Sequence, residues 1–97
     1  MTETTYLLNL SEGHRKYYIV ELHQENKTNS VTAVWGRVGA LGRVQTKLNT
    51  TSPWIARHYY QGLIRTKRNT RDYTVHKVTN NRAEMTVSLI EAVFSQL

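Results

Sequence analysis

The sequence predicts one α+β domain: an antiparallel sheet of four to five strands packed against one basic helix, plus a C-terminal helix. Three observations support this fold class. Short β-prone runs alternate with turn-forming residues over the first half of the chain. A serine followed by a proline at 52–53 is typical of a helix start. The chain has 97 residues, which is enough for one modest hydrophobic core.

The first half of the chain predicts four strands, at residues 6–10, 15–23, 30–34 and 44–48. The second is the clearest, because apolar and aromatic residues recur along it at the period of two that a sheet requires. Polar, turn-forming residues separate the successive runs, so neighbouring strands are expected to pair as hairpins. A closing strand is expected at 73–78, after the helix.

The helix is expected to begin after Ser52, its N-cap, and to end near Lys67. Apolar residues at a spacing of four, with their neighbours, predict one stripe that packs on the sheet. Its members are Ile55, Ala56, Tyr59, Tyr60, Leu63 and Ile64. Gly62 lies in mid-helix, where glycine costs about 1 kcal/mol relative to alanine. Close packing against a strand is one compensation that this position would allow.

Positive charge is concentrated in one part of the chain, although the net charge is only +6. Residues 1–36 hold three Lys/Arg against four Glu, and residues 37–77 hold nine Lys/Arg against one Asp. Residues 78–97 hold one Arg against two Glu. If the fold gathers the central block on one face, it forms an electrostatic footprint for phosphates. The alternative is a solvated basic surface with no ligand.

A glycine-rich connection joins the third and fourth predicted strands. Gly36, Gly39 and Gly42, at a spacing of three, relax the backbone where a tight turn needs a positive φ. Trp35 and Arg37 flank the first glycine and share one face of the strand unless a bulge intervenes. An indole can stack on a base, and a guanidinium suits phosphate oxygens. The alternative is that Trp35 belongs to the core and Arg37 covers it by a cation–π contact.

The run Trp35-Gly36-Arg37-Val38-Gly39, with a glycine again at 42, resembles the signature of the WGR domain. The resemblance covers roughly residues 5–78. In the poly(ADP-ribose) polymerases this domain is a DNA-binding module that helps to recognise strand breaks and relays binding to a separate catalytic domain. The chain also resembles small bacterial WGR proteins. The resemblance implies a non-catalytic module that binds DNA through backbone phosphates, with preference for ends, nicks or single-stranded junctions.

The sequence departs from the family pattern at three places. Many WGR sequences have Gln after the last glycine, where this chain has Arg43, and an Arg before the Trp, where it has Val34. A Lys-Gly-Tyr ending is replaced by Arg71-Asp72-Tyr73. Tyr73 is the natural counterpart of the family tyrosine that lies near the DNA terminus, whereas Asp72 adds an acid where phosphate is expected.

The predicted nucleic-acid contacts combine the motif with the basic residues that follow it. Arg43 and Lys47 lie an even number of residues apart, so they would continue a phosphate track from Arg37 along one strand face. The helix and the connection after it supply the others. The full set is Trp35, Arg37, Arg43, Lys47, Arg57, Arg65, Lys67, Arg68, Arg71 and Tyr73. For each residue alone, a solvated charge or an ordinary packed aromatic is the alternative.

Other function classes find little support in the sequence. Four histidines show no metal-ligand spacing and there is no cysteine, so no metal site or cofactor is expected. No nucleophile or paired-carboxylate motif is present, so an enzyme is not expected. No apolar run reaches the ~20 residues of a membrane span, and the first five residues lack a basic signal. A cytoplasmic protein, in association with the nucleoid if it binds DNA there, is the expectation.

Residues 80–97 are expected to add an amphipathic helix to the domain formed by residues 1–79. Met85, Leu89 and Val93 recur at a spacing of four and predict an apolar stripe. The stripe would close the core, pair two copies of the chain or dock a partner protein. The rival function is therefore a protein–protein adaptor that uses residues 82–97 as its working surface.

Overall fold

The computed structural model describes residues 2–79, which form five strands, one α-helix and one short 3₁₀ turn. In chain order these elements are β1 (Thr2–Asn9), η1 (Ser11–Gly13), β2 (Lys16–Glu25), β3 (Thr28–Arg37), β4 (Arg43–Thr50), α1 (Pro53–Thr70) and β5 (Thr74–Thr79). The predicted α+β class is confirmed, with five strands and one helix. The second helix, expected over residues 80–97, lies outside the described residues.

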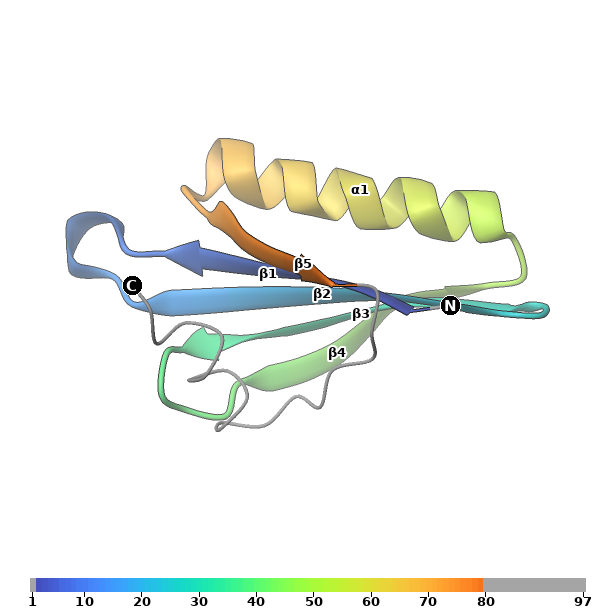
Figure 1. The fold of residues 1–97 in the computed structure, drawn as a ribbon, viewed down its shortest axis with the longest axis horizontal. Coiled ribbons are helices and arrows are strands. Elements are labelled where there is room, and N and C mark those ends of the chain that lie inside the picture. The colour runs from blue at the N-terminus through green and yellow to red at the C-terminus, as the bar shows by residue number, and fades with distance from the viewer. Residues whose placement is uncertain (1, 80–97) are drawn as a thin grey trace.

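All five strands form one antiparallel sheet in the order β4-β3-β2-β1-β5 (Figure 1). The first four follow one another as hairpins, as predicted, and β5 returns to pair with the outer edge of β1. The strands extend beyond the apolar runs that predicted them. Thr2 pairs with His23, and Lys16 pairs with Arg37. Backbone pairing therefore continues into polar residues at both ends of the sheet.

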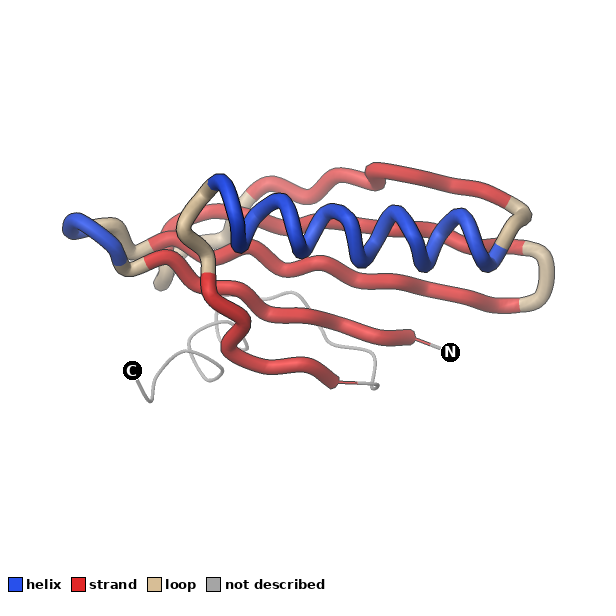
Figure 2. The backbone as a smooth tube through the Cα atoms, turned by 90° about the horizontal axis from the view of Figure 1, so that it is seen from above, coloured by secondary structure: helices blue, strands red, loops and turns tan. Residues whose placement is uncertain are grey.

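The helix α1 lies over one face of the sheet (Figures 1 and 2). Its predicted N-cap is confirmed, since the Ser52 hydroxyl accepts a hydrogen bond of 3.2 Å from the Ile55 backbone N–H. It ends at Thr70, one turn beyond the prediction. Lys67 and Arg68 lie in the last turn, where positive charge interacts favourably with the helix dipole. The core between helix and sheet includes Leu7, Tyr18, Val20, Leu22, Val31, Ala33, Ala56 and Tyr60.

The apolar stripe of α1 is narrower than the sequence predicted. Ala56 and Tyr60 are buried, whereas Ile55 and Tyr59 are 47% and 38% exposed. The small Ala56 lies against the sheet, and the Tyr60 hydroxyl forms a buried hydrogen bond with the Thr5 hydroxyl of β1. These contacts turn the helix so that the neighbouring apolar row faces away from the core.

Close packing against a strand, the compensation that the sequence left open for Gly62, does not explain this glycine. A Cβ at this position would meet no atom of the described residues within 4 Å, so the missing side chain faces open space among them. Residues three or four positions apart in a helix lie on the same face, and Gly62 lies four residues after the exposed His58. The glycine therefore belongs to the outer side of the helix.

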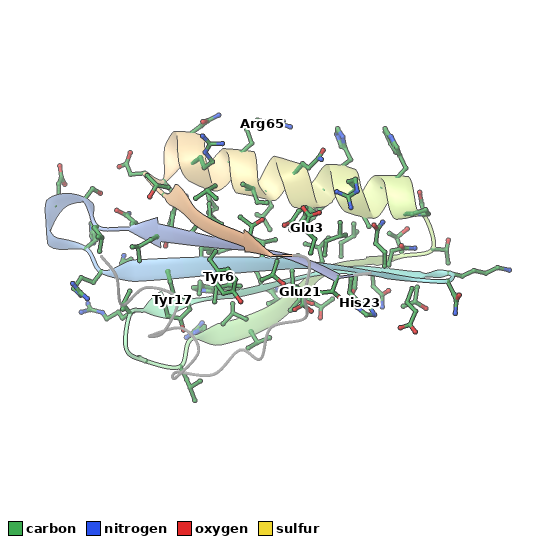
Figure 3. The ribbon with its side chains drawn as sticks, viewed as in Figure 1. Glu3, Tyr6, Tyr17, Glu21, His23 and Arg65 are labelled. Carbon is green, nitrogen blue, oxygen red and sulfur yellow. The ribbon has the colours of Figure 1, made fainter. Side chains whose placement is uncertain are left out.

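The face of the sheet opposite α1 carries a second apolar cluster. It consists of Tyr6, Leu8, Tyr17, Ile19 and Val34, with Val38 beside it. Tyr6 and Tyr17 project from this face in Figure 3. Successive strand residues point to opposite faces, so β2 supplies apolar side chains to both clusters, which agrees with its predicted burial on both sides.

Candidate nucleic-acid interface

Three connections of the chain meet at one end of the sheet, where α1 also ends (Figure 1). They join β1 to β2, β3 to β4, and α1 to β5. We define the basic end as residues 10–16, 37–43 and 67–73. It holds seven of the 13 Lys/Arg of the chain and two acids. The cations are Arg15, Lys16, Arg37, Arg43, Lys67, Arg68 and Arg71.

The glycine-rich connection is held by close backbone contact. Gly39 has a φ of 91°, a conformation that side chains other than glycine rarely adopt. A Cβ on Gly42 would lie 1.9 Å from the Trp35 carbonyl oxygen, so only glycine fits here. The Tyr17 hydroxyl donates a hydrogen bond of 2.8 Å to the Ala40 carbonyl and ties the loop to β2. The loop thus fixes where β3 ends and β4 begins, and with them Arg37 and Arg43.

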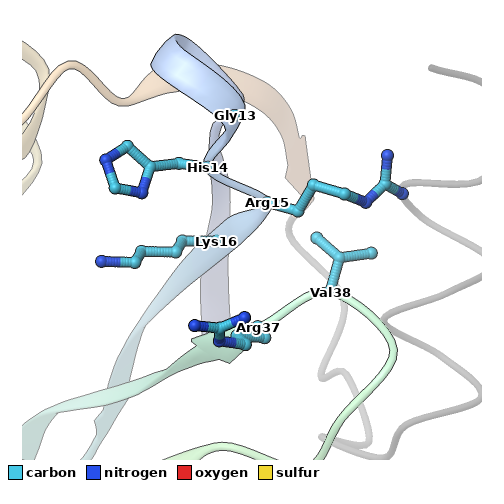
Figure 4. A pocket seen from close by; sticks show the side chains of 6 residues that line it. All are labelled: Gly13, His14, Arg15, Lys16, Arg37 and Val38. Carbon is cyan, nitrogen blue, oxygen red and sulfur yellow. The ribbon is translucent and has the colours of Figure 1, made fainter.

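A shallow hollow of about 220 Å³ lies between the first two connections. Lys16 and Arg37 are paired in the sheet register and both line it. In Figure 4 His14, Lys16 and Arg37 project to one side, while Arg15 projects to the other. The Val38 N–H donates to the Arg15 carbonyl at 2.9 Å, which joins the two connections. Among residues 2–79, none of the residues that line this hollow is acidic.

A row of aromatic rings runs beside this hollow on the helix side of the sheet. Trp35 stacks on Tyr18 with ring centroids 5.8 Å apart, and Tyr73 meets Tyr18 edge-on at 6.0 Å. The Lys47 ammonium lies 4.8 Å from the Trp35 ring, and the Lys67 ammonium lies 4.3 Å from the Tyr18 ring. Each lysine is therefore held by a cation–π contact. The cation on the indole is Lys47 rather than the Arg37 considered in the sequence alternative.

A second hollow, of about 340 Å³, continues from the first toward the end of α1. His14 and Lys16 line both hollows. The second also contains Lys67 and Arg71, together with Glu12 and Asp72. Asn9 donates a side-chain hydrogen bond of 3.1 Å to the Arg71 carbonyl, which fixes the last connection against β1. The two hollows therefore form one continuous surface. The part of this surface near the end of α1 contains acidic as well as basic side chains.

Lys67 is a partly buried cation whose surroundings disfavour its charged form. Burial lowers the pKa of its ammonium, and the nearby positive charges of Arg71 and Lys47 lower it further. Three cations that repel one another would each be stabilised by a bound anion. Burial also raises the pKa of Tyr18 to about 12 and that of Tyr73 above its usual value, so both phenols stay neutral.

Two of the predicted contact residues lie elsewhere. Arg57 forms an ion pair of 3.5 Å with Glu3 and donates to Gln24 at 3.4 Å, near the opposite end of α1. Arg65 projects from α1 away from the sheet (Figure 3). Arg68, which is exposed in the last helical turn, lies within the basic end as defined above. The structure gathers the other predicted residues, Trp35, Arg37, Arg43, Lys47, Lys67, Arg71 and Tyr73, at or beside the basic end.

Sequence reasoning missed four residues of this surface: His14, Arg15, Lys16 and Tyr18. They belong to the first 36 residues, whose net charge is slightly negative, so the charge distribution did not single them out. The hairpin register could have found them. A tight turn near residues 26–27 places residue 16 opposite residue 37 and residue 18 opposite residue 35.

Fold and site together define a small α+β domain that gathers cations and aromatic rings at one end of an antiparallel sheet. The chain belongs to the WGR domain family, whose family model matches residues 1–80. The resemblance inferred from Trp35-Gly36-Arg37 is thereby confirmed. No curated protein and no solved structure matches the chain.

Two further observations concern the part of the chain that the structure describes. Within it, no three His, Cys, Asp or Glu side chains are placed to hold a metal ion. No helix found there combines the length and the apolar character that a membrane span needs.

Proposed function

We propose that this protein binds DNA through backbone phosphates at its basic end, with preference for ends, nicks or single-stranded junctions. The observation that carries the proposal is the convergence of three connections, which brings seven Lys/Arg to one end of the sheet. Membership of the WGR family supports it, because this module occurs in polymerases that bind DNA breaks. Phosphate contacts position a protein without reading sequence, so binding should be only weakly sequence-specific.

The positions of the cations suggest that they contact different phosphates of the DNA. Arg37 and Lys16, side by side in the first hollow, offer a forked guanidinium and an ammonium to two neighbouring phosphates. Lys47 and Lys67 are held on the aromatic row, so less side-chain freedom is lost when they meet the next phosphate. Arg15 projects to the other side and would contact a second strand segment.

Trp35 has a supporting role in this proposal. Its ring packs against Tyr18 and carries the Lys47 ammonium, so the indole positions a cation at the sheet surface. Tyr73 lies at the other end of the same row, beside Arg71 in the second hollow. A break in a duplex, where the strand end is free to enter, would reach this row more easily than a continuous duplex would.

The test is a salt-controlled titration of the protein against intact, nicked, gapped and single-stranded oligonucleotides. We expect tighter binding to the nicked and gapped duplexes, and affinity that falls steeply with salt. Arg37→Ala should weaken binding, and Arg37→Ala with Arg43→Ala should weaken it more. Lys27→Ala, in the turn between β2 and β3 at the other end of the sheet, is the matched control. Unchanged affinity of the folded double variant for a 5′-phosphorylated nicked duplex would refute this surface.

The adaptor function stays a prediction, because residues 82–97 lie outside the described part of the chain. A chain truncated after Asn80 separates the two functions. Loss of self-association or of a partner, with DNA affinity unchanged, would favour the adaptor. Unchanged association together with reduced affinity for DNA would count against the adaptor function.

A further inference from the structure

The outer face of α1 carries an exposed aromatic stripe that the basic end does not use. Trp54 is 72% exposed and stacks on His58, with ring centroids 5.3 Å apart and planes 11° from parallel. Tyr59 follows at 38% exposed. A tryptophan this open contributes little to folding, since most of its apolar surface still meets water. The stripe is therefore open to contact with a ligand.

Gly62 opens a hollow directly beside these rings. The hollow has a volume of about 420 Å³ and is lined by His58, Tyr59, Gly62, Leu63, Arg65 and Thr66. Glycine is unfavourable inside a helix, and no neighbour from residues 2–79 lies within 4 Å to require it here. A larger side chain at position 62 would fill this space. The glycine thus keeps a hollow open between two aromatic side chains and an arginine.

The charge of α1 restricts what this face can accept. The helix contains four Lys/Arg and no Asp or Glu. Arg65 projects away from the sheet (Figure 3) and borders the hollow together with His58, which lies two helical turns before it on the same side of α1. Trp54 and Arg65 are eleven residues apart on one helix, a distance of about 16 Å along its axis. Aromatic rings and a guanidinium along one line suit unpaired bases joined by phosphates.

We propose that the outer face of α1 is a second nucleic-acid site, which binds a short single-stranded segment. One base stacks on the exposed face of the Trp54–His58 pair, and a second enters the hollow kept open by Gly62. Arg65 contacts the phosphate that joins them. This site extends the proposed function, because a single strand that leaves a duplex end could reach it, but it does not depend on the basic end.

The experiment measures affinity of the full chain for short oligo(dT), oligo(rU) and a blunt duplex at one salt concentration. Trp54→Ala should weaken binding to the single strands by at least about fivefold and leave the duplex unaffected. Gly62→Leu, which fills the hollow, should have the same effect while the protein remains folded. Lys27→Gln is the charge control for Arg65→Gln, which should weaken single-strand binding alone.

The possible outcomes decide whether the outer face of α1 binds single strands and whether it does so independently of the basic end. Equal single-strand affinity for wild type and both Trp54→Ala and Gly62→Leu would overturn the proposal. If Trp54→Ala abolishes self-association or the binding of an acidic peptide but not of oligo(dT), the face is a protein interface and the proposal is wrong. Loss of duplex binding in Arg37→Ala, with oligo(dT) binding retained, would support two separate sites. Loss of both in that variant would support one site only.

Discussion

Removing the paired cations of the first hollow is the sharpest test of the basic end. Lys16 and Arg37 are opposite each other in the sheet, and the described part of the chain places no acidic side chain in the lining of the hollow they share. Both are exposed, so Lys16→Gln with Arg37→Gln should leave the fold intact. Each phosphate contact contributes about 0.9 to the slope of log affinity against log salt. We therefore expect the double variant to reduce the slope by about 1.8.

The magnitude follows from the number of cations at this end. If about five of them contact phosphates, the wild-type slope is about −4.5, and affinity falls about 500-fold between about 50 and 200 mM salt. The double variant should then fall only about 40-fold over the same range. Fluorescence anisotropy with a nicked duplex measures both slopes, with Lys27→Gln as control. A double variant that keeps the wild-type slope would refute the reasoning, because its two cations would then touch no phosphate.

Three further predictions concern stability and are checked by urea unfolding. Gly42→Ala should destabilise the protein by about 1–3 kcal/mol, because the new Cβ would lie 2.5 Å from the Tyr17 hydroxyl and 1.9 Å from the Trp35 carbonyl oxygen. A urea midpoint equal to that of the wild type would show that the loop adapts. Gly62→Ala should stabilise it by up to about 1 kcal/mol, since the new methyl meets nothing; destabilisation would mean an unseen constraint. Burial raises the pKa of Tyr18 and Tyr60 to about 12. The unfolded chain ionises near pH 10 while the folded chain keeps these protons, so stability should fall as the pH rises from 10 to 12. Tyr60→Phe should flatten this decline, and an equally steep decline in that variant would contradict the assignment.

The fold could be predicted largely because local signals agreed with it. Alternation in the second strand, the serine–proline helix start and the glycine-rich turn each point to an element that the structure contains. The rotation of α1 could not be predicted in the same way. Ile55 and Ala56 are both apolar, and the choice between their rows depends on tertiary contacts such as the Tyr60–Thr5 hydrogen bond.

The candidate site was only half visible in the sequence, for a related reason. Arg37 was found because it belongs to the motif, and Lys47 was found because it lies in the charged block that continues after the motif. Lys16 was missed because its neighbours in sequence are balanced by glutamates, and only strand pairing brings it to Arg37. Conversely, Arg57 belongs to the charged block, but the length of α1 carries it to the far end of the sheet, where Glu3 pairs with it.

The most direct measurement is a map of backbone amide shifts by nuclear magnetic resonance while a nicked duplex is added. If the three connections of the basic end form one phosphate-binding site, the largest amide shifts will occur in residues 10–16, 37–43 and 67–73. Shifts centred instead on residues 23–29 and 50–57, at the opposite end of the sheet, would contradict it.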